Sequence, residues 1–107
     1  MIDLNLPAGR AVDGHGSTGV TAQALVRSDG TAVTVLRIAA NGEVGRHPAR
    51  VDQLLLVLSG RGAAQAGDGH WQEIHPGQAV VWRAGEEHTT RAVEAMTALV
   101  LEMSAGL

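Results

Sequence analysis

Histidine is the residue type in this chain that is best suited to site chemistry. The 107 residues contain five histidines and no cysteine. A neutral imidazole is a good ligand for Zn, Ni, Cu and Fe(II), and it also forms hydrogen bonds with small molecules. The absence of cysteine excludes disulfides, thiolate nucleophiles and Cys-ligated zinc. Binding of a metal or of a polar ligand by histidine is therefore the first chemistry to consider.

Other familiar catalytic motifs are missing from the sequence. It contains no Gly-x-Ser-x-Gly motif, and the glycine-rich run at 14–17 stands ahead of no predicted helix that would cradle a phosphate. No close pair of carboxylates accompanies His47 in sequence to suggest an acid–base dyad. No residue therefore specifies a particular reaction.

Charge and hydropathy exclude several classes of partner. The net charge is −3, which leaves no basic stripe for a nucleic acid and disfavours an anionic membrane surface. The longest apolar run, 54–58, is far too short to span a bilayer, and no signal peptide is visible. We therefore predict a soluble, cytoplasmic protein with neither a nucleic-acid partner nor a membrane partner.

Short β-rich segments must position any site in this chain. Strands are predicted at 24–27, 31–39, 51–58, 61–66, 70–75, 78–82, 88–93 and 96–101. The pairs Asp29-Gly30, Asn41-Gly42 and Asp68-Gly69 are typical of turns that need a positive φ, and Ser59-Gly60 is expected to close the strand before it. This spacing favours a sandwich or barrel.

Two regions are expected along the chain. Residues 1–20 are glycine-rich, and we predict an irregular N-terminal arm with at most a short strand. Residues 21–107 are predicted to form a single β-barrel domain, because a chain of this length supports one core.

The predicted strand at 51–58 is apolar on both faces. Gln53, Leu55 and Val57 share one face, and the three leucines at 54, 56 and 58 share the other. We expect one face to meet the barrel interior and the other to meet a second sheet layer or another subunit. A core with two Trp, no Phe and no Tyr is only marginally stable alone. Both observations favour a homodimer.

The stretch from Gly42 to His88 resembles the two motifs of the cupin superfamily. His47, Gln53 and Gly60 fall on the spacing of the first motif. Gly77, Gly85 and His88 fall on that of the second. The departures are Ala49 for the second histidine, Gln53 for the glutamate, Arg83 for a proline and Ala92 for the terminal asparagine, with Gly42 displaced by one position. Two of the four usual metal ligands survive as histidine.

This resemblance implies a small antiparallel β-barrel or jelly roll with a site inside it. His47 and Gln53 would lie on adjacent antiparallel strands and point inward, with His88 across from them. These three residues are the expected metal ligands, and the pocket around them is expected to include Trp82, Arg37, Thr90 and Leu55. The cofactor would be one divalent transition metal (Zn, Ni, Mn, Fe or Cu) or none, because two imidazoles and an amide do not neutralise a divalent cation.

Three interpretations of the histidine–glutamine trio stay open: a metal site, a metal-free polar pocket and an inert core network. We favour a protein that binds a small molecule. The alternatives are a metal-dependent enzyme of oxygenase or isomerase type and a non-catalytic dimeric interaction module. The remaining polar candidates are expected at the surface: His15, His70 and His75, the loop residues Glu86 and Glu87, and Arg83, which fits either an anionic ligand or a salt bridge at the rim.

Overall fold

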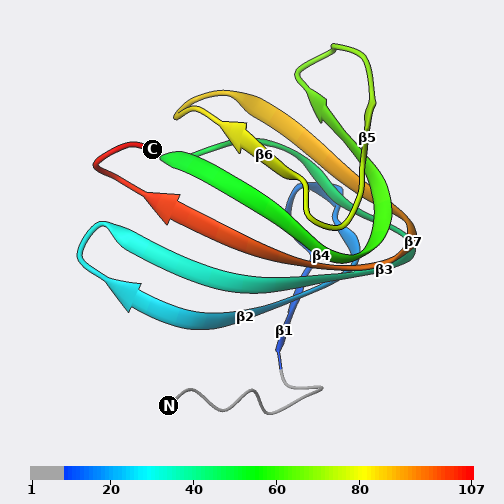
Figure 1. The fold of residues 1–107 in the computed structure, drawn as a ribbon, viewed down its shortest axis with the longest axis horizontal. Coiled ribbons are helices and arrows are strands. Elements are labelled where there is room, and N and C mark those ends of the chain that lie inside the picture. The colour runs from blue at the N-terminus through cyan, green and yellow to red at the C-terminus, as the bar shows by residue number, and fades with distance from the viewer. Residues whose placement is uncertain (1–8) are drawn as a thin grey trace.

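The chain folds almost entirely into β-strands (Figure 1). The computed structural model describes residues 9–107. Its elements are β1 (Arg10–Val12), a 3-10 turn η1 (Gly14–Gly16), β2 (Thr18–Ser28), β3 (Thr31–Pro48), β4 (Asp52–Ala66), β5 (Gln72–Ile74), β6 (Ala79–Trp82) and β7 (Glu87–Met103). Every strand pair is antiparallel, which confirms the predicted all-β antiparallel class. Within residues 9–107, no helix is long and apolar enough to cross a membrane.

Strand β7 lies at the centre of the sheet. The strand order is β1-β2-β3-β7-β4-β5, and β6 pairs with the first half of β4. β7 pairs with β3 on one side and with β4 on the other, along most of its length. The long strands bend sharply, so that the sheet wraps around an interior space (Figure 1). In this topology β7 lies beside β4, and its inward-facing His88 stacks on Trp82 of β6.

The three longest strands are continuous where the sequence predicted interruptions. Asn41 in β3 has φ +64° and Gly60 in β4 has φ +77°, yet both strands continue through these positions. The expected turn at Asn41-Gly42 and the expected strand end at Ser59-Gly60 are therefore wrong. A positive φ also suits a bulge or bend inside a strand, and the pairing of β4 with β7 shifts register around Ser59. The hairpin predicted at Asp29-Gly30 does connect β2 and β3.

The predicted N-terminal arm is partly built into the sheet. Residues 1–8 lie outside the described residues. Of the rest, 10–12 form β1 and pair with β2, which already begins at Thr18. η1 contacts β3, where the backbone N–H of Gly45 donates a 2.9 Å hydrogen bond to Ser17 Oγ. Residues 10–19 are thus part of the barrel wall.

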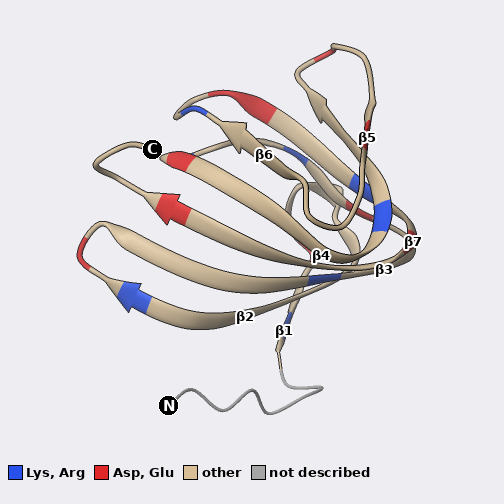
Figure 2. Cartoon of the chain, in the orientation of Figure 1, with Lys and Arg blue, Asp and Glu red and all other residues tan. Residues whose placement is uncertain are grey.

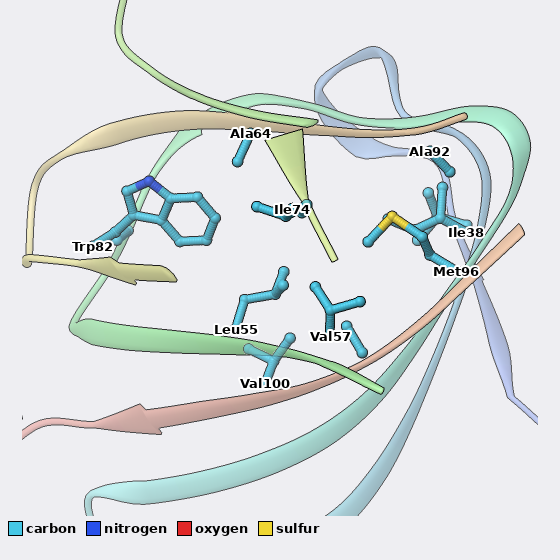
Figure 3. Packing of buried hydrophobic residues seen from close by; sticks show 12 residues of the cluster. Ile38, Leu55, Val57, Ala64, Ile74, Trp82, Ala92, Met96 and Val100 are labelled. Carbon is cyan, nitrogen blue, oxygen red and sulfur yellow. The ribbon is translucent and has the colours of Figure 1, made fainter. Parts of the chain in front are cut away.

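The core is built from small and medium aliphatic side chains of the inward-facing strand positions. Leu55, Val57 and Val100 point into the same interior as Trp82 (Figure 3). Several other core positions are alanines: Ala49, Ala64, Ala92 and Ala98. On the opposite face of β4, Leu58 is 50% exposed in the single chain. The interior face is therefore covered as predicted, whereas the outer face of β4 is only partly covered.

Candidate functional site

A cavity of about 570 Å³ lies inside the barrel. Six of the seven predicted site residues line it, and they are His47, Gln53, Leu55, Trp82, His88 and Thr90. Arg37 does not, because alternation along β3 places it one residue after the cavity-lining Leu36. The structure therefore gives no support to Arg37 as a pocket residue.

His47 and His88 are the two histidines of the site whose rings lie closest together. They are cross-strand partners on β3 and β7, and their ring centroids lie 4.3 Å apart at an interplanar angle of 57°. His47 Nδ1 lies 2.7 Å from the carbonyl oxygen of Gly45. A carbonyl only accepts, so Nδ1 carries the proton and Nε2 of His47 is left as an acceptor.

His88 is a buried histidine with unsatisfied nitrogens. Its side chain is 4% exposed, and its ring stacks on Trp82 with centroids 4.0 Å apart. Neither ring nitrogen has a hydrogen-bond partner among residues 9–107. Burial lowers the pKa of His88 to about 4, with a smaller contribution from repulsion by His47. The ring is therefore neutral at pH 7, with one nitrogen that can donate a hydrogen bond and one that can accept. Both nitrogens lost their bonds to water on burial, and no hydrogen bond from the described residues replaces those bonds.

Gln53 reaches the cavity from a different direction than the cupin resemblance implied. The expectation that His47 and Gln53 lie on adjacent strands is wrong, because β7 lies between β3 and β4. Gln53 instead pairs in register with Trp82 on β6 and Glu102 on β7. The three predicted ligands therefore share one cavity, but they come from three different strands of its wall.

His15 is a cavity residue that the sequence analysis placed at the surface. It is exposed, yet it lines the cavity and stacks on His47 with ring centroids 5.3 Å apart. A Cβ on Gly45 would overlap the carbonyl oxygen of His15, so η1 sits directly on β3. The one feature of the sequence that could have indicated this contact is Gly45, because a glycine in a strand often marks a place where another segment of backbone approaches closely. The other two histidines, His70 and His75, are exposed as predicted.

Three of the polar residues that the sequence analysis expected at the surface, Arg83, Glu86 and Glu87, lie outside the cavity lining. Arg83 Nη1 lies 3.1 Å from Asp52 Oδ2, which supports the salt-bridge interpretation of Arg83. Two backbone N–H groups and Arg83 lower the pKa of Asp52. Glu86 and Glu87 are exposed as predicted, and Glu87 pairs with Arg46.

The side chains of the cavity do not fit a tightly held metal ion. Within the described part of the chain, no group of three or more His, Cys, Asp or Glu side chains is placed to hold a metal. At the predicted metal site the cavity offers the tilted imidazoles of His47 and His88 and a neutral amide, and position 49 is an alanine. The third imidazole of the cavity, His15, is exposed and, among the described residues, stacks against His47 alone. A divalent cation would receive no charge compensation from His47, His88 and Gln53. We therefore derive no chemistry through a metal.

Comparison with known proteins supports the fold. The family described as a cupin domain matches residues 34–104. A conserved Streptococcus pyogenes protein of unknown function is 28% identical at a TM-score of 0.71, over 78% of this chain and 73% of that one. A predicted oxalate decarboxylase from Thermotoga maritima is 15% identical, with a TM-score of 0.85. The match covers 96% of this chain and 97% of that one. The polyketide cyclase RemF from Streptomyces resistomycificus is 22% identical, with a TM-score of 0.81. The match covers 97% of this chain and 80% of that one.

No curated protein matches the sequence. The family match nevertheless spans well over half of the chain, and the barrel agrees with the solved cupin-like structures over almost their full lengths. The match also includes His47, Gln53 and His88, the three positions on which the resemblance rested. The chain belongs to the cupin domain family.

Proposed function

We propose that this chain is a small-molecule-binding cupin that takes an organic ligand into the barrel cavity without a resident metal. The observation that carries the proposal is His88, a neutral buried imidazole on the cavity wall that has no partner for either nitrogen in the part of the chain that the structure describes. A buried polar group without a partner costs free energy, and a bound ligand or ordered water would remove that cost.

The size and lining of the cavity support binding of a small molecule. Ligand sites typically enclose roughly 300–1,000 Å³ and combine apolar walls with a few placed polar groups. This cavity has about 570 Å³, with apolar walls that include Leu36, Leu55 and Val100. His47 Nε2 is available as an acceptor, because Nδ1 is held by the carbonyl of Gly45. The ligand would thus be anchored at one end by neutral hydrogen-bonding groups.

The metal-dependent enzyme is the second candidate. Members of the cupin family often bind divalent metals, and the structural neighbours include a predicted oxalate decarboxylase and a polyketide cyclase. At the motif positions of the second histidine and the glutamate, this chain has Ala49 and Gln53, which do not favour tight metal binding. Metal analysis of protein purified without an affinity tag or chelator separates the two candidates.

The binding proposal is tested by imidazole NMR on histidine-labelled protein. The probes are three carboxylic acids and their amides: phenylacetate, cinnamate and hexanoate with phenylacetamide, cinnamamide and hexanamide. We expect at least one probe to shift the ring signals of His47 and His88 saturably and to leave those of the exposed His70 and His75 in place. Signals of His47 and His88 that stay unchanged with all six probes at millimolar concentration would contradict the proposal.

A further inference from the structure

We infer that the ligand of the cavity is an organic anion, whose acidic group is bound by Arg27 and Arg50 at the mouth while its apolar body occupies the barrel. This inference rests on the proposed function, because it names the chemical class of the ligand for the same cavity. Neither arginine belongs to the cupin motifs, and neither was singled out by the sequence analysis.

Arg27 faces the cavity because of a bulge in β2. The pairing of β2 with β3 shifts register between Ala24 and Val26. Before the shift, Ala24 pairs with the cavity-lining Thr34, so an unbroken alternation would turn residue 27 to the outer face. After it, Arg27 pairs with Ala32, on the same face as Thr34. Bulges commonly re-aim a side chain next to a site, and this bulge turns a guanidinium toward the cavity.

Arg50 reaches the same mouth from the connection between β3 and β4. Both arginines also line a second, smaller hollow of about 270 Å³ beside the hairpin of β2 and β3. The one carboxylate among the lining residues is Glu102, whose Oε2 lies 4.0 Å from Arg50 Nη2. In Figure 2 the basic end of β2 and the acidic end of β7 lie at the same edge of the molecule, with β3 between them.

The charge balance of the mouth favours an anion. Two guanidiniums and one carboxylate give a local charge of +1, on a chain whose net charge is −3. Among residues 9–107, Arg27 forms no ion pair, and the 4.0 Å pair leaves Arg50 free to turn to a ligand. The carboxylates of Asp29 and Asp52 are outside the cavity lining. Arginine is well suited to a carboxylate, because its planar fork can donate two parallel hydrogen bonds.

The deeper part of the cavity suits the uncharged part of such a ligand. Apart from histidine, the lining has no ionisable side chain other than Arg27, Arg50 and Glu102. Leu55, Val100 and the ring of Trp82 offer apolar contact. An anion with an apolar body therefore has one orientation that satisfies both regions, with the acid outward and the body inward.

The test compares each carboxylic acid with its amide, because the members of a pair differ in charge and little in shape. Affinities are measured by the imidazole NMR titration for wild type, Arg27→Gln, Arg50→Gln, the double variant and the control Arg61→Gln. Arg61 is exposed, pairs with Glu94 at 3.0 Å and lies outside the cavity lining. All five proteins are first checked for an unchanged thermal midpoint.

We expect wild type to bind at least one acid about tenfold more tightly than its amide. Each single variant should lose several-fold of the acid affinity only, since both side chains are exposed and screened. The double variant should lose the preference, and Arg61→Gln should keep it. A sixth protein, Glu102→Gln, is given the same thermal check and should bind the acid more tightly than wild type.

Two outcomes would overturn the inference. Equal affinity of acid and amide in wild type, or an acid preference that survives in the double variant, would refute the anion assignment and leave the cavity as the binding site. Probes that leave His47 and His88 unchanged would refute the proposed function and this inference together. Failure of the ligand class is thus distinguished from failure of the site.

Discussion

Replacing His88 by phenylalanine tests the cost of keeping an unsatisfied imidazole in the barrel wall. Phenylalanine is close to histidine in size and retains the stack on Trp82, but it has no nitrogen to leave without a partner. Removing an unsatisfied buried group recovers about 1–3 kcal/mol at most. In the absence of ligand at pH 7, we therefore expect His88→Phe to be at least as stable as wild type, by up to about 2 kcal/mol.

The contribution of His88 to stability can also be worked out as a function of pH. The pKa of His88 is about 4 in the folded chain and 6.5 in the reference state, so between these values the unfolded chain binds a proton that the folded chain does not. The contribution of the neutral His88 to the free energy of unfolding is therefore fully present above pH 6.5 and is lost as the pH falls toward 4. Each pKa unit corresponds to about 1.4 kcal/mol, which gives a loss of about 2 kcal/mol at pH 5 and about 3 kcal/mol below pH 4.

The assay is urea unfolding followed by circular dichroism at pH 7 and pH 5, for wild type, His88→Phe and the control His70→Phe. His70 is exposed outside the barrel cavity. On going from pH 7 to pH 5, wild type and His70→Phe should each lose about 2 kcal/mol more than His88→Phe. An equal loss in wild type and His88→Phe would refute the buried, neutral state of His88.

Three further predictions concern the metal, η1 and the oligomeric state. Mass spectrometry of untagged protein should find a transition metal well below one per chain, and stoichiometric metal that disappears in His47→Ala/His88→Ala would contradict the metal-free proposal. Gly45→Ala should lower the unfolding free energy by about 1–3 kcal/mol in urea, because its Cβ would overlap the His15 carbonyl and displace η1; unchanged stability would show that η1 does not rest on β3. The homodimer stays a prediction from the apolar outer face of β4, and sedimentation at tens of micromolar should give about twice the 11.1 kDa of the chain; a monomer mass would count against it.

The fold and six residues of the cavity lining could be predicted, because they follow from strand patterns and from the spacing of the cupin motifs. Alternation showed which residues share a face with Leu55 and with Trp82, and the cupin resemblance identified those faces as inward and located His47 and His88. Strand continuity could not be predicted in the same way. A positive φ at Asn41 suits a hairpin and a bent strand alike, and only pairing with β7 decides between them.

The residues that were missed depend on tertiary contacts. Arg27 reaches the cavity through a one-residue register shift, which no periodicity in β2 announces. His15 reaches it because η1 docks on Gly45, a contact between segments about 30 residues apart in the chain. Arg37, in contrast, was predicted from its residue type, although its place in the alternation of β3 turns it away from the cavity.

The central position of β7 has a consequence for synthesis. β3 and β4 both precede β7 in the chain, and each needs it as a hydrogen-bonded neighbour. Until residues 87–103 have been made, β3 and β4 therefore leave backbone groups unpaired on the sides that β7 will occupy, and open strand edges of this kind favour aggregation. When β7 is inserted, it closes both ladders and brings His88 to His47 and Trp82 in the same event. Closure of the barrel and assembly of the cavity wall around His88 therefore both require β7.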